Sequence, residues 1–526
     1  KFIDKLAKMG IMDTAISLNE VKHTKDAKKT DGKKTKNIRG IPKLIDANYA
    51  GGAKSSSCTL ILCEGDSAKS GIVSGLSKED RNIIGIYPLK GKLMNVRDAT
   101  AKKINENNEI ADIKKILGLE SNKKYTPEMV KNSLRYGKVL FMTDQDLDGS
   151  HIKGLCINIF HSMWPELFKL HGFIGFMNTP ILKAKKGKRE IPFYNEAQYI
   201  SWKKVNKLER GKMRGWRVKY YKGLGTSTSK EFKEYFEKKK IVHFNWHSEA
   251  CDNAIDMVFN KKRANDRKQW LGAYDRTDVL DTRKDDIPFD EFIHKEMIHF
   301  SKYDCERSIP SMVDGLKTSQ RKCLFAAFKR KLTKEIKVAQ LSGYVSEQAA
   351  YHHGEMSLQK TLVGLAQDFV GSNNINLFVP NGQFGTRLQG GKDSASERYI
   401  YTLLNPITYK IFPELDNPIL SYQDDDGAPV EPEFYAPIIP MILVNGGKGI
   451  GTGFSTDIPS FNPKQIIQYL KNKLKNKSNA NTTIEPYYRG FKGAIIKIEP
   501  KKYLFKAVYK ILSTEKVHIT ELPIGV

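Results

Sequence analysis

The chain has 526 residues, 40% of them hydrophobic, which is enough for several folded domains rather than one. Its 87 lysines and arginines outnumber its 59 acidic residues, which gives a formal net charge of +28. This charge favours a polyanionic partner, and nucleic acid is a better candidate than an anionic membrane surface. No run of about 18 apolar residues predicts a membrane span. The chain starts without Met, lacks the apolar block of a signal peptide and ends within strand-like text, so we expect a soluble, intracellular fragment of a longer protein.

The first recognisable segment, residues 22–39, is lysine-rich and almost free of large apolar residues. It cannot build a core and predicts a mobile loop, either solvated or in contact with nucleic acid. Two strand-helix steps typical of an α/β sheet follow. The first has a strand over 59–63 and a helix beginning near Ser67 or Ala68, and the second has a strand over 138–143, an acidic loop and a helix to about Trp164.

The second half of the chain shows a different pattern of predicted secondary structure. Residues 250–300 are polar and helical in pattern and predict a connector. A turn punctuated by Pro and Gly then leads into a basic amphipathic helix, and further helices run to about residue 370. The sequence after residue 410 is typical of strands and turns. The chain has no internal repeat.

The cysteines are scattered and form no C-x-x-C pair. This spacing indicates neither a zinc site nor a disulfide framework, so we expect reduced and mostly structural thiols. The six are Cys58, Cys63, Cys156, Cys251, Cys305 and Cys323.

The acidic loop TDQDLDG places Asp144, Asp146 and Asp148 at the end of a predicted strand. In an extended loop the three carboxylates face one side, where their repulsion favours a divalent cation, and hard oxygen ligands suit Mg²⁺. A calcium EF-hand loop starts in the same way but requires a glutamate at its twelfth position, which here is Leu155, and a preceding helix instead of this strand. A solvated acidic turn remains the alternative for this motif alone.

Glu64 also follows an apolar strand. Because the carboxyl ends of parallel strands converge at one edge of a sheet, Glu64 and the three aspartates are expected to share one metal site.

The segments EGDSAKSG, PLKGKLMNVRDA, DQDLDGSHI and YYKGLGTST together resemble the metal-binding TOPRIM domain of a type IIA DNA topoisomerase. Domains of this kind also occur in primases and some nucleases. The resemblance runs from about residue 10 to the end of the chain, and it implies DNA contacts for Lys90, Lys92 and Lys222.

The stretch SERYIYTLL contains two tyrosines, Tyr399 and Tyr401, and only Tyr399 directly follows an arginine, Arg398. A Tyr after an Arg is most often surface or packing. The longer block PNGQFGTRLQGGKDSASERYIYTLL, however, resembles the active-site segment of the eukaryotic type IIA enzymes, in which the tyrosine after the arginine attacks DNA. A phenol with a pKa of about 10 needs help to lose its proton, and an arginine supplies charge for the phosphate. Pro406 makes a helix after this tyrosine uncertain.

Other matches extend the resemblance to the rest of the site. IPSMVDGLKTSQRK is similar to the family's entrance to its winged-helix domain, which makes Arg321 a phosphate contact. In YHHGE, His353 is the better candidate than His352 for binding the scissile phosphate or relaying a proton, and a buried structural pair is the open alternative.

The glycine-rich stretch NGGKGIGTGF lacks the order of a nucleotide-binding P-loop. The resemblance instead makes Ile450 the residue that wedges between base pairs and bends the duplex, and Lys448 a phosphate contact. Unstacking costs a few kcal/mol, which the added phosphate contacts of the bent duplex can offset.

The resemblance implies a multidomain α/β and α+β fold with a TOPRIM Rossmann-like domain, a winged-helix domain and a mixed α/β tower. The corresponding segments are 1–240 for the TOPRIM domain with its flanks, 241–305 for a helical connector, 306–410 for the winged-helix domain with the nucleophilic tyrosine, and 411–526 for an incomplete tower without coiled coil and C-gate.

The implied function is transient double-strand cleavage of DNA through 5′-phosphotyrosyl links. A homodimer would join each tyrosine to the partner's acids and two Mg²⁺, replaceable by Mn²⁺ or Ca²⁺. ATP would be used only through an N-terminal domain absent from this chain. The implied location is the nucleus, or a viral replication site or virion if the source is viral. A metal-dependent nuclease or primase and a non-enzymatic DNA-bending protein remain the alternatives.

Overall fold

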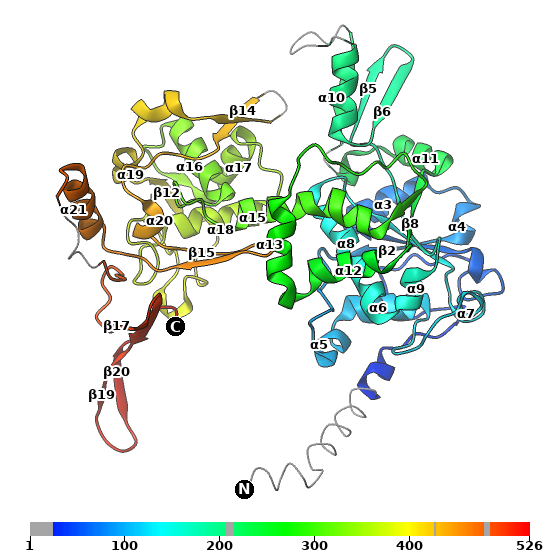
Figure 1. The fold of residues 1–526 in the computed structure, drawn as a ribbon, viewed down its shortest axis with the longest axis horizontal. Helices are drawn as coiled ribbons and strands as arrows, with labels where there is room; N and C mark the ends of the chain where they lie inside the picture. Colours follow the sequence, from blue (N-terminus) through cyan, green and yellow to red (C-terminus); the bar gives the residue numbers. More distant parts are fainter. Residues whose placement is uncertain (1–24, 207, 209–214, 222, 426–427, 478–483) are drawn as a thin grey trace. The chain divides into compact units, whose positions relative to one another are not determined.

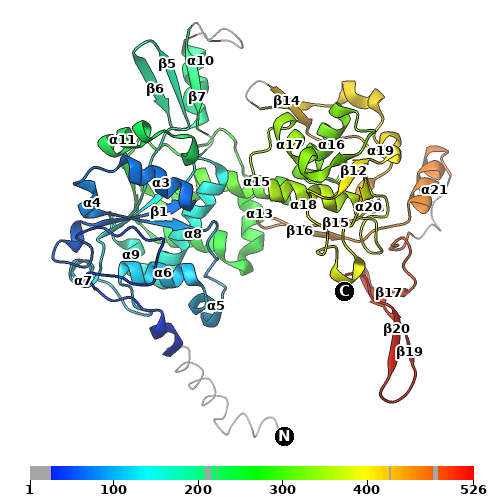
Figure 2. The same cartoon turned by 180° about the vertical axis from the view of Figure 1, so that it is seen from behind.

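The computed structural model describes residues 25–206, 208, 215–221, 223–425, 428–477 and 484–526. The chain folds into two compact units, Lys1–Tyr303 and Asp304–Val526. Figure 1 shows their elements coloured along the sequence, and Figure 2 shows the opposite side.

The first unit is built on a six-stranded sheet in the order β2-β1-β3-β4-β8-β9. β1 runs parallel to both β2 and β3, and β4 runs parallel to β3. The middle residues of β1 are buried, as expected of a central strand covered on both faces. The strands are β1 (Thr59–Glu64), β2 (Ile84–Leu89), β3 (Lys138–Met142), β4 (Ile174–Met177), β8 (Ile241–Asn245) and β9 (Asp286–Pro288).

One face of this sheet is covered by α3 and α11, which pack against Ile61 of β1 and Leu140 of β3. The two helices can approach closely because Gly71 and Gly75 of α3 have no side chain. A Cβ at either position would overlap Phe232 of α11. Besides α10 (Glu196–Val205), the α-helices of this unit before α15 (Ile298–Ser308) include α3 (Gly65–Gly75), α4 (Asp80–Ile83), α5 (Ala101–Asn105), α6 (Asn108–Leu117), α7 (Pro127–Ser133), α8 (Leu147–Met163), α9 (Pro165–Lys169), α11 (Ser229–Lys238), α12 (Glu249–Phe259), α13 (Ala264–Gly272) and α14 (Phe289–Phe292).

Both predicted strand-helix steps are present. The first helix, α3, begins at Gly65, two to three residues before the predicted start, and α8 ends at Met163, next to the predicted end. The predicted boundary between residues 240 and 241 falls inside the sheet, because β8 pairs with β4 and β9 pairs with β8. Residues 241–288 therefore complete the first fold rather than only connecting it to the next.

A smaller antiparallel sheet, β6-β5-β7, is inserted between β4 and α11. Its strands are β5 (Leu182–Lys186), β6 (Arg189–Phe193) and β7 (Arg217–Tyr220), and α10 (Glu196–Val205) lies beside it in Figure 1. It has its own small core, in which Phe193 and Tyr199 pack edge to face.

The second unit contains three main helices around a three-stranded sheet, β10-β12-β11. Leu324, Leu341 and Leu362 come from different helices and share one hydrophobic core with Phe378 of the sheet. The elements are α16 (Thr318–Arg330), β10 (Ile336–Lys337), α17 (Val338–Gln348), α18 (Glu355–Ala366), β11 (Phe378–Asn381) and β12 (Tyr401–Leu404), preceded by α15 (Ile298–Ser308), which begins in the first unit.

The remainder of this unit consists of hairpins and short helices, as the turn-rich sequence after residue 410 predicted. Pro406 does not interrupt a helix after Tyr399: the residues 401–404 form β12, and Pro406 is the first residue of α19, where proline is well tolerated. The elements are α19 (Pro406–Ile411), β13 (Tyr422–Asp425), β14 (Ala428–Pro432), α20 (Met441–Val444), β15 (Gly447–Ile450), β16 (Ser455–Ile458), α21 (Pro463–Leu474), β17 (Ala494–Glu499), β18 (Lys502–Lys506), β19 (Val508–Ile511) and β20 (Val517–Glu521).

Within the described ranges, no helix is both long enough and apolar enough to cross a membrane.

Candidate functional site

The predicted acidic residues gather at one edge of the first unit's sheet. Glu64 is the last residue of β1, and Asp144 and Asp146 follow β3, the strand that pairs with β1 in parallel. Glu64 Oε2 accepts a hydrogen bond from the Asp144 main-chain N–H at 3.2 Å. Asp148 lies one residue inside the start of α8. Parallel pairing of two strands thus brings together carboxylates that are 80 residues apart in sequence.

Two of these carboxylates are held by main-chain amides. Asp146 caps α8, with its Oδ1 accepting the N–H of Gly149 at 2.7 Å, the usual role of an aspartate before a helix. Asp144 Oδ1 accepts the N–H of Leu224, also at 2.7 Å. Both side chains are therefore oriented before any cation binds.

Gly223, in the segment YYKGLGTST, is needed for the second of these contacts. A Cβ at this position would lie 2.4 Å from Asp144 Oδ2, much closer than side-chain atoms approach one another. The sequence interpretation singled out this segment for Lys222, which lies outside the described residues. It missed the support that Gly223 and Leu224 give to Asp144, because only the fold brings the two loops together.

The electrostatics of this edge favour a cation. Burial, together with the negative charges of Asp144, Asp146 and Asp148, raises the pKa of Glu64 to about 7, against the opposing hydrogen bond from the Asp144 amide. Burial also raises the pKa of Asp144. Carboxylates that repel one another in a partly desolvated place are the oxygen donors that Mg²⁺ prefers, so this donor set fits the predicted metal.

Two of the three lysines predicted to bind DNA, Lys90 and Lys92, lie within the described residues and have different surroundings. Lys92 Nζ forms an ion pair with Asp148 at 2.6 Å and lies 5.0 Å from the centre of the Phe300 ring. Lys90 is exposed, and its main-chain N–H donates to Glu109. Lys92 is thus the one of these two that is tied to the acidic edge.

The two tyrosines that looked alike in sequence differ in the second unit. Tyr399 lies in a turn closed by its N–H and the Ser396 carbonyl, and its side chain is 70% exposed. Tyr401 is the first residue of β12, where it pairs with Lys337 and Asn381 in the sheet and is 37% exposed. Tyr399 is the tyrosine that is free to reach a large ligand.

Arg398 accompanies Tyr399 in the same turn. Its side chain is exposed, and its guanidinium carbon lies 5.6 Å from the centre of the Tyr399 ring. The pair offers a phenol and a permanent positive charge on one face, as their adjacency in sequence predicted.

Arg321 differs from its prediction. On α16 it is buried, and Nε and Nη2 form a two-pronged ion pair with the buried Asp314, at 2.7 and 3.0 Å. Nη2 also donates to the Leu316 carbonyl. Because these donors are engaged inside the core, Arg321 holds the turn before α16 and its guanidinium is buried.

Both histidines of YHHGE are exposed, which contradicts the alternative of a buried structural pair. His352 Nε2 lies 2.8 Å from Asp425 Oδ2. The ring of His353 packs edge to face on Tyr351, with centroids 5.4 Å apart. Their exposure is compatible with a contact to a large ligand.

The glycine-rich stretch 445–454 forms the first strand and the turn of a hairpin, β15–β16, and not a strand-to-helix phosphate loop. Ile450 ends β15 with 75% of its surface exposed, unusual for an isoleucine of a folded protein. Lys448 is equally exposed and lies 3.3 Å from Asp457 on the opposite strand. The hairpin therefore presents an apolar tip with a cation behind it.

Three protein-family models match consecutive parts of the chain. They are the Toprim domain over residues 59–177, the C-terminal associated domain of TOPRIM over 177–305, and the A subunit of DNA gyrase/topoisomerase IV over 307–526.

Whole relatives match across the entire chain. The chain is 50% identical to DNA topoisomerase 2 of Arabidopsis thaliana over 99% of its own length and 35% of the relative's, and 48% identical to that of Drosophila melanogaster over 100% and 37%. It thus spans about a third of the length of these curated relatives. Among solved structures, the DNA-binding, cleavage and re-ligation domain of Plasmodium falciparum topoisomerase II matches with a TM-score of 0.76 and 48% identity, over 93% of this chain and 66% of that one.

Proposed function

The chain belongs to the type II DNA topoisomerase family, and we propose that it is the part that binds, cleaves and rejoins double-stranded DNA. The observation that carries the proposal is that one chain holds both an exposed tyrosine beside an arginine and an edge of four carboxylates. A nuclease or primase needs the acids alone, and a DNA-bending protein needs neither.

Tyr399 is the proposed nucleophile. Its phenolic oxygen attacks a backbone phosphorus, the new bond is a 5′-phosphotyrosyl ester, and the bond from phosphorus to the 3′-oxygen breaks. The phenolic proton leaves to solvent or through His353, and the 3′-oxygen departs as a hydroxyl after gaining a proton. Rejoining is the reverse reaction, so the bond energy is kept in the ester.

Arg398 and His353 assist this step. The guanidinium stays charged at all relevant pH values and binds two phosphate oxygens at once, which stabilises the charge that develops on phosphorus. Imidazole hydrogen bonds a phosphate or moves a proton near neutral pH. Arg321 enters the proposal only as a support of the turn before α16, because Asp314 occupies its guanidinium.

Glu64, Asp144, Asp146 and Asp148 are the proposed Mg²⁺ ligands. When bound there, Mg²⁺ supplies positive charge for the leaving 3′-oxygen, and a second ion would anchor a neighbouring phosphate. Lys92, whose Nζ lies 2.6 Å from Asp148 Oδ1, would then stand beside the ion and within reach of the DNA backbone. Mn²⁺ and Ca²⁺ are hard enough cations to substitute.

DNA would be held by the basic groups and bent by the β15–β16 hairpin. Ile450 is the proposed wedge between base pairs, and Lys448, Lys90, His352 and Lys222 are proposed backbone contacts. The proposed assembly is a homodimer in which each tyrosine works with the acids of the partner, and the proposed location is the nucleus. In the whole protein, ATP would be used by a domain outside this chain, and the second unit would divide into winged-helix and tower domains.

The test is to mix the chain with plasmid DNA and Mg²⁺, denature it rapidly and look for protein attached to 5′ ends. Tyr399→Phe should lose the attached protein completely, whereas the neighbouring control Tyr401→Phe should keep most of it. Cleavage that persists in Tyr399→Phe would identify a metal-dependent nuclease instead. Equal loss in both variants would leave Tyr399 unsupported as the nucleophile.

A further inference from the structure

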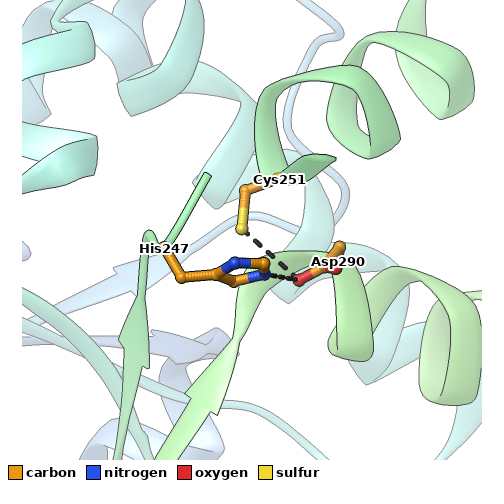
Figure 3. Close-up of side chains that lie close together, drawn as sticks. All are labelled: His247, Cys251 and Asp290. Carbon is orange, nitrogen blue, oxygen red and sulfur yellow. Dashed lines mark hydrogen bonds and ion pairs between the residues drawn. The ribbon is translucent and has the colours of Figure 1, made fainter. Parts of the chain in front are cut away.

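A second group of metal-ligating side chains lies away from the acidic edge. His247, Cys251 and Asp290 direct their polar atoms toward one another, as Figure 3 shows. His247 Nε2 is 3.0 Å and Cys251 Sγ is 3.4 Å from the same atom, Asp290 Oδ1. Across the described ranges, this is the group in which three His, Cys, Asp or Glu ligand atoms all lie within 4.8 Å of one another.

The topology of the sheet creates this group. β8 and β9 are parallel neighbours, with Asn245 opposite Pro288 at their carboxyl ends. After β8 the chain turns through His247 into α12, whose first turn contains Cys251, and after β9 it enters α14, which contains Asp290. The three residues therefore come from two segments that are held side by side by main-chain hydrogen bonds, and each backbone position is fixed.

The distances fit a tetrahedral metal centre. With metal–ligand bonds of about 2.0 to 2.3 Å, ligand atoms around Zn²⁺ lie roughly 3.3 to 3.7 Å apart. The two separations from Asp290 Oδ1, 3.0 and 3.4 Å, are close to this range, and all three ligand atoms lie within 4.8 Å of one another. A thiolate together with an imidazole selects Zn²⁺ over the hard cations Mg²⁺ and Ca²⁺. The carboxylate completes a set of three protein ligands and leaves one position for water or an external ligand.

The burial of the group is graded in a way that suits such a centre. Cys251 is fully buried, the Asp290 side chain is 24% exposed and the His247 side chain is 45% exposed, so an ion has access from the histidine side. The main-chain carbonyl of Asn245 at the end of β8 lies 3.9 Å from Cys251 Sγ and helps to hold the thiol in place.

We propose that His247, Cys251 and Asp290 form a zinc site that is independent of the Mg²⁺ site. Zinc would join the turn between β8 and α12 to the start of α14. The site does not depend on the proposed DNA cleavage, since none of its residues belongs to that machinery.

Binding would exchange one proton for the ion. In the metal-free chain the Cys251 thiol donates its hydrogen to Asp290 and burial raises its pKa, while main-chain amides of His247 and Asp290 lower it. On coordination a bond from sulfur to zinc forms, the S–H bond breaks and the proton leaves to solvent. The carboxylate and the imidazole nitrogen then turn from each other toward the ion.

The experiment uses Co²⁺ as the probe, because a cobalt–thiolate bond absorbs in the near ultraviolet and an all-oxygen site does not. The purified chain is stripped of metals, placed in excess Mg²⁺ to saturate the acidic edge, and titrated with Co²⁺. The expected result is one thiolate-bound Co²⁺ per chain, displaced by Zn²⁺. Absence of the thiolate band would overturn the proposal.

Variants assign the band to these residues. Cys251→Ser should abolish it, and His247→Ala, at an exposed position that does not threaten folding, should weaken Co²⁺ binding by more than about tenfold. Two matched controls should keep it: Cys305→Ser, a thiol elsewhere, and His171→Ala, which removes an exposed histidine paired with Asp286 at 2.8 Å. A band that survives His247→Ala undiminished would also reject the site.

Discussion

The two candidate metal sites of the first unit lie at different strand pairs of the same sheet. At β1 and β3, four carboxylates meet; at β8 and β9, an imidazole, a thiol and one carboxylate meet. In both places parallel pairing aligns the carboxyl ends of two strands, so loops that are distant in sequence become neighbours. The backbone arrangement is common to the two sites, and the donor atoms decide which cation each one prefers.

Removal of acidic donors should separate the sites most strongly. Asp146→Asn combined with Asp148→Asn should reduce Mg²⁺-dependent DNA cleavage by more than about 100-fold, because the edge loses two of its charged ligands. The thiolate band of Co²⁺ at Cys251 should remain, since that site shares no ligand. Cleavage assays and cobalt spectra on the same preparation measure both. Loss of both signals would mean that the variant has unfolded or that the sites are one.

Exchange of a soft donor for a hard one should reduce the difference in metal preference between the two sites. Cys251→Asp keeps a short side chain at the first turn of α12 but removes the thiolate, so Zn²⁺ affinity should fall by more than about tenfold and the cobalt–thiolate band should vanish. Calorimetric titration with Zn²⁺ measures the change. Unaltered Zn²⁺ affinity would show that sulfur is not a ligand.

Support for a ligand can be removed without touching the ligand. Gly223→Ala introduces a Cβ 2.4 Å from Asp144 Oδ2, so the carboxylate must move and its contact with Leu224 must lengthen. We expect about a tenfold lower affinity for Mn²⁺ at the acidic edge, as for other changes of groups that orient a ligand. Gly225→Ala, at a position with open space around it, is the matched control. Equal effects of the two changes would remove this role from Gly223.

The smallest effect should come from pH. Glu64 has a pKa of about 7, above its ordinary value of 4.5, so in the metal-free chain it holds a proton that the unfolded chain has already lost. Its contribution to stability is therefore present below about 4.5 and is lost as pH rises toward 7. Mn²⁺ competes with that proton, so affinity at the acidic edge should rise several-fold between pH 6 and about 8. Glu64→Gln should flatten this rise, and an unchanged pH profile would contradict the assignment.

Several features could be predicted from short stretches of sequence. Glu64 and the three aspartates follow strands that are easily recognised by their apolar runs. Arg398 and Tyr399 are consecutive residues, so they are neighbours whatever the fold. The family resemblance, carried by long motifs, was confirmed by matches over the whole chain. Local sequence was a poorer guide to features that tertiary contacts determine. The Arg321 guanidinium forms an ion pair with Asp314, and the sheet continues past residue 240.

The sequence by itself determined the family, the acidic edge and which tyrosine has a cation beside it, because these depend on order along the chain. Only the tertiary structure decided that Tyr399 is exposed while Tyr401 is held in a sheet, and that Gly223 supports Asp144. It also reopened the question of zinc. Scattered cysteines gave no sign of a site, since ligands gathered by the pairing of β8 with β9 share no spacing that a sequence motif could record.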